Sequence, residues 1–221
     1  MRERVFKDRA DAGRVLASRL EDYRGDPQAI VLALPRGGVP VGYEVARALD
    51  LPLDVFLVRK LGTPGREELA MGAIASGGVR VLNEEVVTVW GIPEDVIEAA
   101  TKRETAELER RNHLYREGYE EVALEGKSVI LVDDGLATGS TMRAAVEAVR
   151  EHRPNKIVVA VPTAAANTCE ELARSVDEVI CVMTPEPFQA VGLWYEDFAQ
   201  TGDGEIRDLL ARARSERGAE G

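Results

Sequence analysis

Short apolar runs alternate with amphipathic stretches along most of this chain. An apolar run that ends in polar residues is typical of a buried parallel strand, and apolar residues at helical spacing predict an amphipathic helix. The predicted strands are 29–34, 53–58, 129–132, 156–161 and 178–183, with 67–75 and 79–82 as a hairpin, and the predicted helices are 11–23, 41–49, 95–117, 141–152, 168–175 and 205–214. Alternating strands and helices predict an α/β fold, an open, mostly parallel sheet with helices on both faces.

One domain is expected rather than two, because a chain of 221 residues fits one sizeable core with an appendage. The core is predicted to comprise residues 10–83 and 125–184. Residues 84–124 do not fit the alternation of strands and helices. Together with residues 185–214 they are assigned to a small hood, or cap.

The segment 129–143, Val-Ile-Leu-Val-Asp-Asp-Gly-Leu-Ala-Thr-Gly-Ser-Thr-Met-Arg, is the most informative part of the sequence. Asp133 and Asp134 follow a predicted strand, at the sheet edge where open α/β sheets bind ligands. Residues 137–141, here called the phosphate loop, bring hydroxyls and backbone N–H groups to a helix N-terminus, which is a ready anion site. A sugar phosphate fits this order of groups. The Asp-Asp-Gly string alone would equally fit a turn with helix-capping acids.

A second loop at the same sheet edge, residues 35–38, has the sequence Pro-Arg-Gly-Gly and is called the Arg-Gly-Gly loop. Its glycines let the backbone approach a ligand, and the planar fork of Arg36 suits phosphate oxygens. Arg59 and Lys60 close the next predicted strand. Alone, the loop would fit a tight turn and the two basic residues a solvated strand end. Beside the 129–143 segment, they indicate binding of a phosphorylated ligand.

Composition narrows the possible partners and location. A formal net charge of −11 argues against non-specific binding of nucleic acid or an anionic membrane, so neither is expected as a partner. The first nine residues are charged and lack the apolar core of a signal peptide, and no stretch is long enough for a membrane span. Cys169 and Cys181 show neither metal-ligand spacing nor a disulfide framework. They are interpreted as reduced core residues, which predicts a cytoplasmic protein.

The whole 129–143 string resembles the signature of the type I phosphoribosyltransferases, which bind 5-phosphoribosyl-1-diphosphate (PRPP) at this loop. The resemblance implies Mg²⁺-dependent transfer of the phosphoribosyl group to a nitrogen acceptor, expected to be a nucleobase, with release of pyrophosphate. It implies that Asp133 and Asp134 hold the ribose hydroxyls, directly or through metal-bound water. The other implied site residues are Arg36 and Lys60 on the pyrophosphate and Gly37, Gly38, Arg59, Arg66, Gly135, Leu136, Ala137, Thr138, Gly139, Ser140, Thr141, Phe188 and Trp194 in substrate binding.

The same resemblance implies further features. A non-proline cis peptide is expected at 36–37 or nearby, because the family grips pyrophosphate through such a loop. Residues 61–69 are the candidate for a mobile lid, with Arg66 as an additional anion contact. Phe188 and Trp194 are candidates for stacking on the base, with Glu196 or Asp197 reading its polar atoms. A homodimer is also expected.

The sequence leaves the acceptor open. Members that act on hypoxanthine and guanine carry an aspartate where this chain has Ala137, so the sequence argues against a 6-oxopurine. Nothing separates purine from pyrimidine or excludes a non-nucleobase amine. One alternative is a regulatory protein that binds PRPP or a nucleotide without catalysis, because the motifs would look identical. Another is a phosphatase with Asp133 as nucleophile, which would need metal-binding acids at other strand ends.

Overall fold

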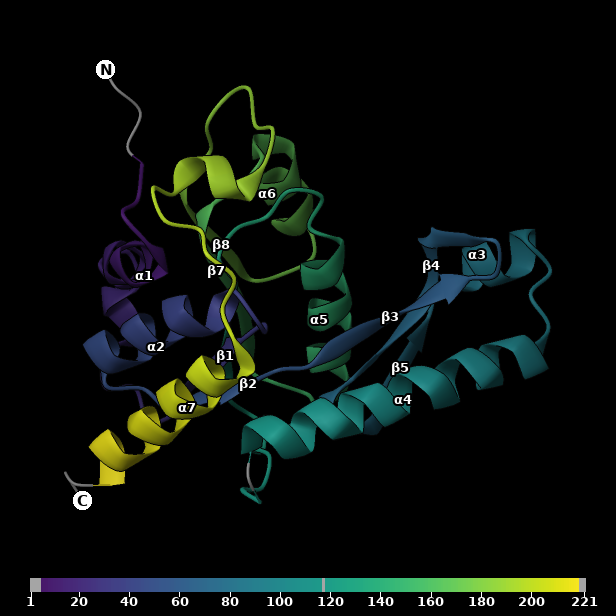
Figure 1. The fold of residues 1–221 in the computed structure, drawn as a ribbon, viewed down its shortest axis with the longest axis horizontal. Coiled ribbons are helices and arrows are strands. Elements are labelled where there is room, and N and C mark those ends of the chain that lie inside the picture. The colour runs from purple at the N-terminus through teal and green to yellow at the C-terminus, as the bar shows by residue number, and fades with distance from the viewer. Residues whose placement is uncertain (1–4, 117, 219–221) are drawn as a thin grey trace.

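The centre of the molecule is a five-stranded, fully parallel sheet with the order β2-β1-β6-β7-β8. The computed structural model describes residues 5–116 and 118–218 (Figure 1). The strands are β1 (Ala29–Ala33), β2 (Leu53–Val55), β6 (Ser128–Val132), β7 (Lys156–Thr163) and β8 (Glu178–Met183). The sheet confirms the prediction of a mostly parallel α/β fold.

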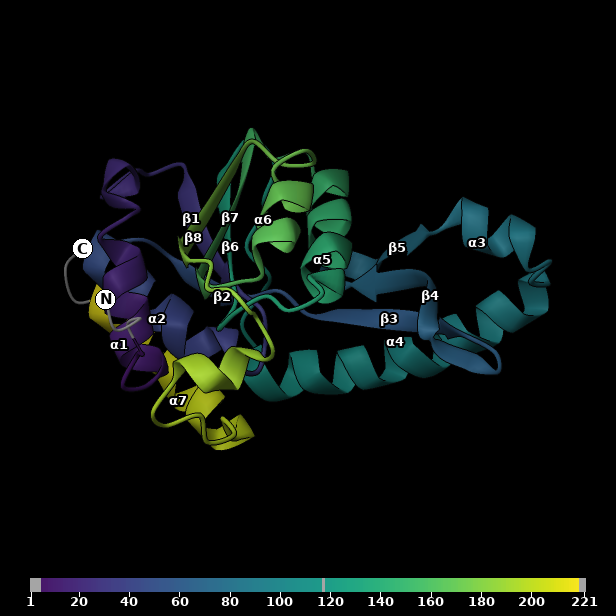
Figure 2. The same cartoon turned by 90° about the horizontal axis from the view of Figure 1, so that it is seen from above.

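Helices cover both faces of this sheet (Figure 2). Alternate strand residues face opposite sides, so Val31 belongs to the apolar cluster under α1, α2 and α7, and Leu32 belongs to the cluster under α5. The elements outside the extension described below are α1 (Arg9–Ala17), α2 (Gly38–Leu49), α5 (Ser140–Glu151), α6 (Ala166–Leu172), α7 (Asp203–Gly218) and the 3-10 turns η1 (Glu21–Tyr23) and η3 (Val191–Trp194).

An extension projects from the sheet and contains a second, antiparallel sheet (Figures 1 and 2). Its elements are β3 (Val58–Thr63), β4 (Arg66–Ala75), the turn η2 (Ser76–Gly78), β5 (Val79–Leu82), α3 (Glu84–Val89) and α4 (Glu94–Arg116). The β4–β5 hairpin agrees with the sequence prediction. The predicted strand 53–58 is wrong beyond Val55, because residue 58 already pairs with β4. The extension therefore starts at Val58 and not at residue 84.

A buried ion pair anchors the far end of α4 to the central sheet. Arg116 donates to the Asp54 carboxylate and, at 2.9 Å, to the carbonyl of Val55. Both side chains of the pair are almost inaccessible to solvent. The pairing fixes the extension on β2, and it also occupies an acid that a metal-dependent phosphatase could otherwise have used.

The lengths and sequences of the described helices show whether any of them could span a membrane. Within residues 5–116 and 118–218, no helix combines the length and apolar character needed to cross a bilayer.

Candidate functional site

The Arg-Gly-Gly loop and the two acids lie side by side, because they follow the adjacent parallel strands β1 and β6. The N–H of Leu34 still donates to the carbonyl of Val132 at 2.9 Å, so the two strand ends separate only beyond this point. A Cβ atom on Gly38 would lie 2.7 Å from the carbonyl oxygen of Val132 and 2.9 Å from the Cα of Asp133. Glycine at this position therefore allows the two backbones to meet. The structure thus joins the two predicted motifs into one site.

A Gly38→Ala substitution tests this close approach. We expect the free energy of unfolding to fall by about 1–3 kcal/mol, because a methyl group forced against backbone atoms has nowhere to move. Gly204→Ala in α7 is the matched control, since a Cβ there meets nothing within 4 Å and alanine favours a helix. Urea denaturation of both variants measures the effect, and equal stabilities would contradict the account of Gly38.

The non-proline cis peptide lies between Pro35 and Arg36, one bond before the predicted 36–37 position. Arg36 itself is exposed at the turn, and Gly37 packs against the carboxylate of Asp134. A Cβ on Gly37 would come within 1.9 Å of Asp134 Oδ2. The Arg-Gly-Gly loop is therefore open to ligand on the Arg36 side and closed against the acids on the other.

The two acids have different surroundings. Asp133 Oδ1 accepts a 2.8 Å hydrogen bond from the N–H of Asp134. Burial, with the neighbouring Asp134 charge as the second cause, raises the pKa of Asp133 well above its ordinary value. Burial also raises the pKa of Asp134, although Arg9 acts in the opposite direction. Because burial disfavours the negative charge of these carboxylates, a hydroxyl group or a cation that binds to them stabilises the charged form.

Arg9 is a site residue that the sequence analysis missed. Its Nε donates to Asp134 Oδ2 at 2.8 Å, and the side chains of the pair are only 11% and 15% exposed. Its Nη1 donates to the carbonyl of Ala199 at 2.7 Å, and its guanidinium lies 4.0 Å from the ring centre of Phe198. Arg9 therefore joins α1, the end of β6 and the C-terminal segment. The charged N-terminal stretch of the sequence carries no motif that would have indicated this.

Tyr195 holds the same acid from a further direction. Its hydroxyl donates to the backbone carbonyl of Asp134 at 2.5 Å, and its ring packs on Phe6 and Phe198. Tyr195 thus connects Asp134 to an aromatic cluster that also contains Phe6 and Phe198. With Arg9 on one oxygen and Tyr195 on the carbonyl, Asp134 is fixed in place, and Asp133 is the less constrained acid of the pair.

The phosphate loop leads directly into α5. Gly139 takes the left-handed conformation (φ 66°), and no described side chain caps the helix that starts at Ser140. The first N–H groups of α5 are therefore open to an anion, and the helix dipole favours negative charge there. The hydroxyls of Thr138 and Ser140 lie 3.2 Å apart, and Thr141 is exposed beside them.

Lys60 reaches the phosphate loop from the extension. Its Nζ donates to Ser140 Oγ at 2.7 Å, so β3 delivers a positive charge to the anion site. The family resemblance assigns Lys60 to the pyrophosphate, whereas the structure places its ammonium on the phosphate loop. Lys60 therefore belongs to the same site as the two acids, at the end where the helix begins.

The other two predicted basic residues, Arg59 and Arg66, contact side chains of the extension instead of the phosphate loop. Arg59 forms an ion pair with Glu104 of α4 at 2.6 Å. Arg66 is the first residue of β4, and its guanidinium lies 4.3 Å from the ring centre of Trp90. The candidate lid, residues 61–69, falls in the β3–β4 hairpin of the extension and is not the open loop that the sequence suggested. Most of this segment forms strand hydrogen bonds within the β3–β4 hairpin. Its mobility stays a prediction.

Gly135 and Leu136 fix the path of the backbone between Asp134 and the phosphate loop. The N–H of Leu136 donates to the carbonyl of Thr163 at 3.0 Å, which ties the start of the loop to the end of β7. A Cβ on Gly135 would meet the Val191 side chain at 2.5 Å, so the chain after β8 packs directly over this glycine. These contacts set the position of Ala137.

The candidates for stacking on a base receive little geometric support. Trp194 packs against an apolar cluster of Phe6, Ala12 and Tyr195, and its Nε1 is buried without a partner among the described residues. In the described part of the chain, no ring contact joins Phe188 to the loops. The Asp197 carboxylate accepts the N–H of Ala199, and Glu196 is exposed. Tyr195 and Val191, rather than the predicted aromatic residues, contact the signature residues.

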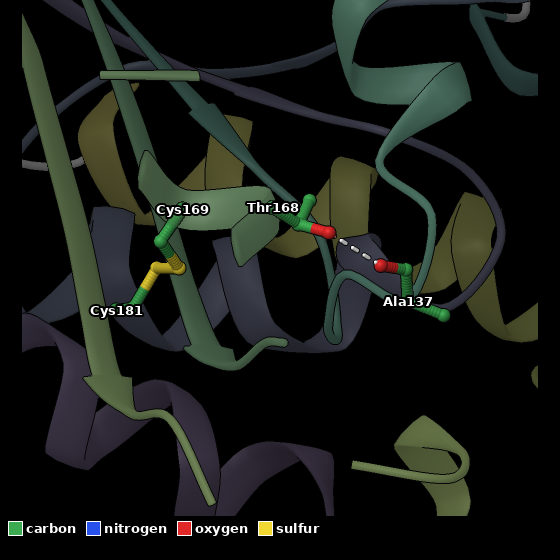
Figure 3. Close-up of a disulfide and its surroundings, with 4 residues drawn as sticks. All are labelled: Ala137, Thr168, Cys169 and Cys181. Carbon is green, nitrogen blue, oxygen red and sulfur yellow. Dashed lines mark hydrogen bonds between the residues drawn. A yellow bond between two sulfur atoms is a disulfide. The ribbon is translucent and has the colours of Figure 1, made fainter. Parts of the chain in front are cut away.

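The two cysteines are joined by a disulfide, which contradicts their interpretation as reduced core residues (Figure 3). Cys169 lies in α6 and Cys181 in β8, and both are half-buried. Their separation of 12 residues carries no disulfide signal in the sequence. The fold pairs them because α6 returns onto the edge strand.

The protein donors at this site suit a metal ion shared with a ligand. No group of three or more metal-binding side chains occurs in the described residues. Asp133 and Asp134 each keep one carboxylate oxygen outside the hydrogen bonds to Arg9 and to the backbone. A cation held mainly by water and ligand oxygens, as Mg²⁺ prefers, fits such a pair.

The chain is similar to known proteins along nearly its whole length. Residues 4–193 match the phosphoribosyl transferase domain family. The chain belongs to this family. The crystal structure of TT1426 from Thermus thermophilus is 40% identical, covers 94% of this chain and 98% of that chain, and superposes with a TM-score of 0.86. The family assignment agrees with the resemblance seen in residues 129–143.

Curated relatives extend this comparison. The proposed phosphoribosyl transferase Rv0571c of Mycobacterium tuberculosis is 46% identical over 210 residues, which cover 95% of this chain and 47% of that protein. The chain thus spans about half the length of this relative. A protein of Geobacter named bifunctional protein PyrR is 33% identical over 128 residues, 54% of this chain and 70% of its own.

Proposed function

We propose that this protein is a phosphoribosyltransferase that binds PRPP with Mg²⁺ between the Arg-Gly-Gly loop and the phosphate loop. It transfers the 5-phosphoribosyl group to a nitrogen acceptor, a nucleobase in the first instance, and releases pyrophosphate. The observation that carries the proposal is the contact of the Arg-Gly-Gly loop with Asp133 and Asp134, with an uncapped helix N-terminus a few residues further along. Sugar hydroxyls, 5′-phosphate and pyrophosphate each find a matching group.

The roles follow from position. The N–H groups at the start of α5 and the hydroxyls of Thr138, Ser140 and Thr141 bind the 5′-phosphate, with Lys60 neutralising charge beside them. Asp133 accepts hydrogen bonds from the ribose hydroxyls. The exposed Arg36 binds the pyrophosphate, and Gly37 and Gly38 let the loop pack against the two acids. Arg9 acts indirectly, by holding Asp134 in place.

The chemistry needs positioning and charge neutralisation. The bond from the anomeric carbon to pyrophosphate breaks, a bond to the acceptor nitrogen forms, and the acceptor loses a proton. Positive charge develops on the sugar and negative charge on the leaving group, so preorganised dipoles and cations lower the barrier. Bound Mg²⁺ would neutralise pyrophosphate oxygens, with Asp133 and Asp134 as its candidate protein contacts through water.

A pyrophosphate-release assay tests the activity and identifies the acceptor. PRPP and Mg²⁺ are supplied with single purine bases, pyrimidine bases or small amines, and Asp133→Asn is the control for background hydrolysis. We expect one acceptor class to raise pyrophosphate release at least about tenfold above that control. Ala137 predicts that adenine or a pyrimidine will exceed hypoxanthine and guanine.

A contrary result would separate two functions. If the protein binds PRPP but no acceptor raises pyrophosphate release, the transferase proposal fails and a regulatory PRPP-binding protein replaces it. If PRPP does not bind, both fail.

A further inference from the structure

A short helix, α6, contacts the phosphate loop and supports its position. Thr168 of α6 donates through Oγ1 to the carbonyl of Ala137 at 2.7 Å (Figure 3). Its methyl group lies against the other end of the loop, since a Cβ on Gly139 would come within 2.6 Å of Thr168 Cγ2. Thr168 is only 3% exposed. One buried side chain therefore contacts both Ala137 and Gly139 and sets where the loop sits.

The disulfide attaches this helix to the sheet. Cys169 follows Thr168 directly, and its partner Cys181 lies within β8 (Figure 3). A helix of seven residues has little stability of its own, so its position depends on such attachments. A second link between α6 and the loop region is the exposed Arg143–Glu171 ion pair at 3.2 Å, which contributes little because water screens it.

We infer that Thr168 is a positioning residue for the phosphate loop and that the Cys169–Cys181 disulfide makes this positioning redox-dependent. The oxidised protein holds α6 on β8 and the loop in its binding shape. Reduction releases α6, Thr168 moves away from Ala137, and affinity for the 5′-phosphate falls. This inference rests on the proposed function, because it assigns the 5′-phosphate to that loop.

The redox step is thiol–disulfide exchange with a dithiol. A thiolate of the dithiol attacks one sulfur and forms a mixed disulfide, and its second thiol then displaces the remaining cysteine. The dithiol loses two electrons and two protons and ends as a disulfide, and Cys169 and Cys181 end as thiols. Both cysteines are half-buried rather than enclosed, so a small dithiol can reach them.

The test compares three ligands in calorimetric titrations of oxidised and dithiothreitol-reduced protein. Alkylation and mass spectrometry first establish the oxidation state of Cys169 and Cys181. Reduction is expected to weaken PRPP and ribose 5-phosphate about fivefold, the effect of losing one ordinary hydrogen bond, and to leave inorganic pyrophosphate unchanged. A general loss of structure would instead weaken all three ligands together.

Variants separate the effect of the Thr168 hydrogen bond from the effect of the disulfide. Thr168→Val keeps the shape but loses the hydroxyl, so it should reproduce the ribose 5-phosphate weakening in the oxidised state. Cys169→Ser/Cys181→Ser should bind like the reduced wild type and ignore reductant. Thr101→Val in α4 is the matched control, because it removes a similar 2.8 Å hydroxyl-to-carbonyl bond away from the loop.

Several outcomes would overturn the inference. Free thiols at both cysteines after treatment with an oxidant would show that the disulfide does not form. Unchanged affinities on reduction or in Thr168→Val would show that Thr168 does not position the phosphate loop. Failure of the proposed PRPP site looks different, because oxidised wild type would then not bind PRPP at all, whereas failure of catalysis alone appears only in the pyrophosphate-release assay.

Discussion

Asp133→Asn is expected to weaken PRPP binding severely and at the same time to make the folded protein more stable. Binding should weaken about a hundredfold, because the ribose hydroxyls lose charge-assisted hydrogen bonds to the carboxylate. Stability should rise by about 0.5–2 kcal/mol, the gain commonly seen when a strained functional group is removed. The amide oxygen can still accept the N–H of Asp134, so the local hydrogen bond survives.

The pH dependence follows from the raised pKa of Asp133. The folded state binds this proton more tightly than the unfolded state, whose pKa is near the ordinary value of 3.8. Wild-type stability therefore falls as pH rises from that value through the raised pKa of the folded state, and the penalty is complete above it. Asp133→Asn lacks this loss, so its advantage should grow with pH and then level off.

Urea denaturation at a series of pH values, with calorimetry of PRPP binding, measures both effects. Asp208→Asn on the exposed face of α7 is the matched control and should change neither. Weaker binding with lower stability would indicate that Asp133 is a structural acid and not a ligand-binding one.

Arg9→Ala is expected to lower the free energy of unfolding by about 3 kcal/mol, because Asp134 is left in a buried position without its partner. The substitution also removes the hydrogen bond to Ala199 and the contact with Phe198. With Asp134 released, Gly37 loses the surface on which it packs, so PRPP affinity should fall as well.

Arg14→Ala provides the control on the same helix. Arg14 is 50% exposed, and its ion pairs are 3.7 Å long, so we expect a change within about 0.5 kcal/mol. Arg9→Lys should recover part of the lost stability only, since one ammonium cannot serve Asp134, Ala199 and Phe198 at once. If Arg9→Ala and Arg14→Ala unfold at the same urea concentration, Arg9 does not fix Asp134.

Much of the site could be predicted from sequence because its signals are local. A few neighbouring residues are enough to predict the local structure in three places: the apolar run before Asp133, the small residues of the phosphate loop and the paired glycines of residues 37–38. Parallel strands then bring these segments to the same sheet edge without further information. The order of strands and helices follows from the same local patterns.

The residues that sequence analysis missed act across long separations. Arg9 and Asp134 are 125 positions apart, and Tyr195 and Asp134 are 61 apart, so no spacing in the chain connects them. The Cys169–Cys181 pair likewise depends on how α6 returns to β8. Residues 58–63 look like the continuation of a strand or a loop until β4 supplies their partner. The homodimer and the cytoplasmic location stay predictions.

Calorimetric titration of PRPP into the oxidised protein, with and without Mg²⁺, tests directly whether this site binds PRPP. We expect saturable binding to one site per chain that requires Mg²⁺ and that Asp133→Asn loses while remaining folded. Absence of binding to the folded wild type, or equal binding by Asp133→Asn, would contradict the assignment of this site.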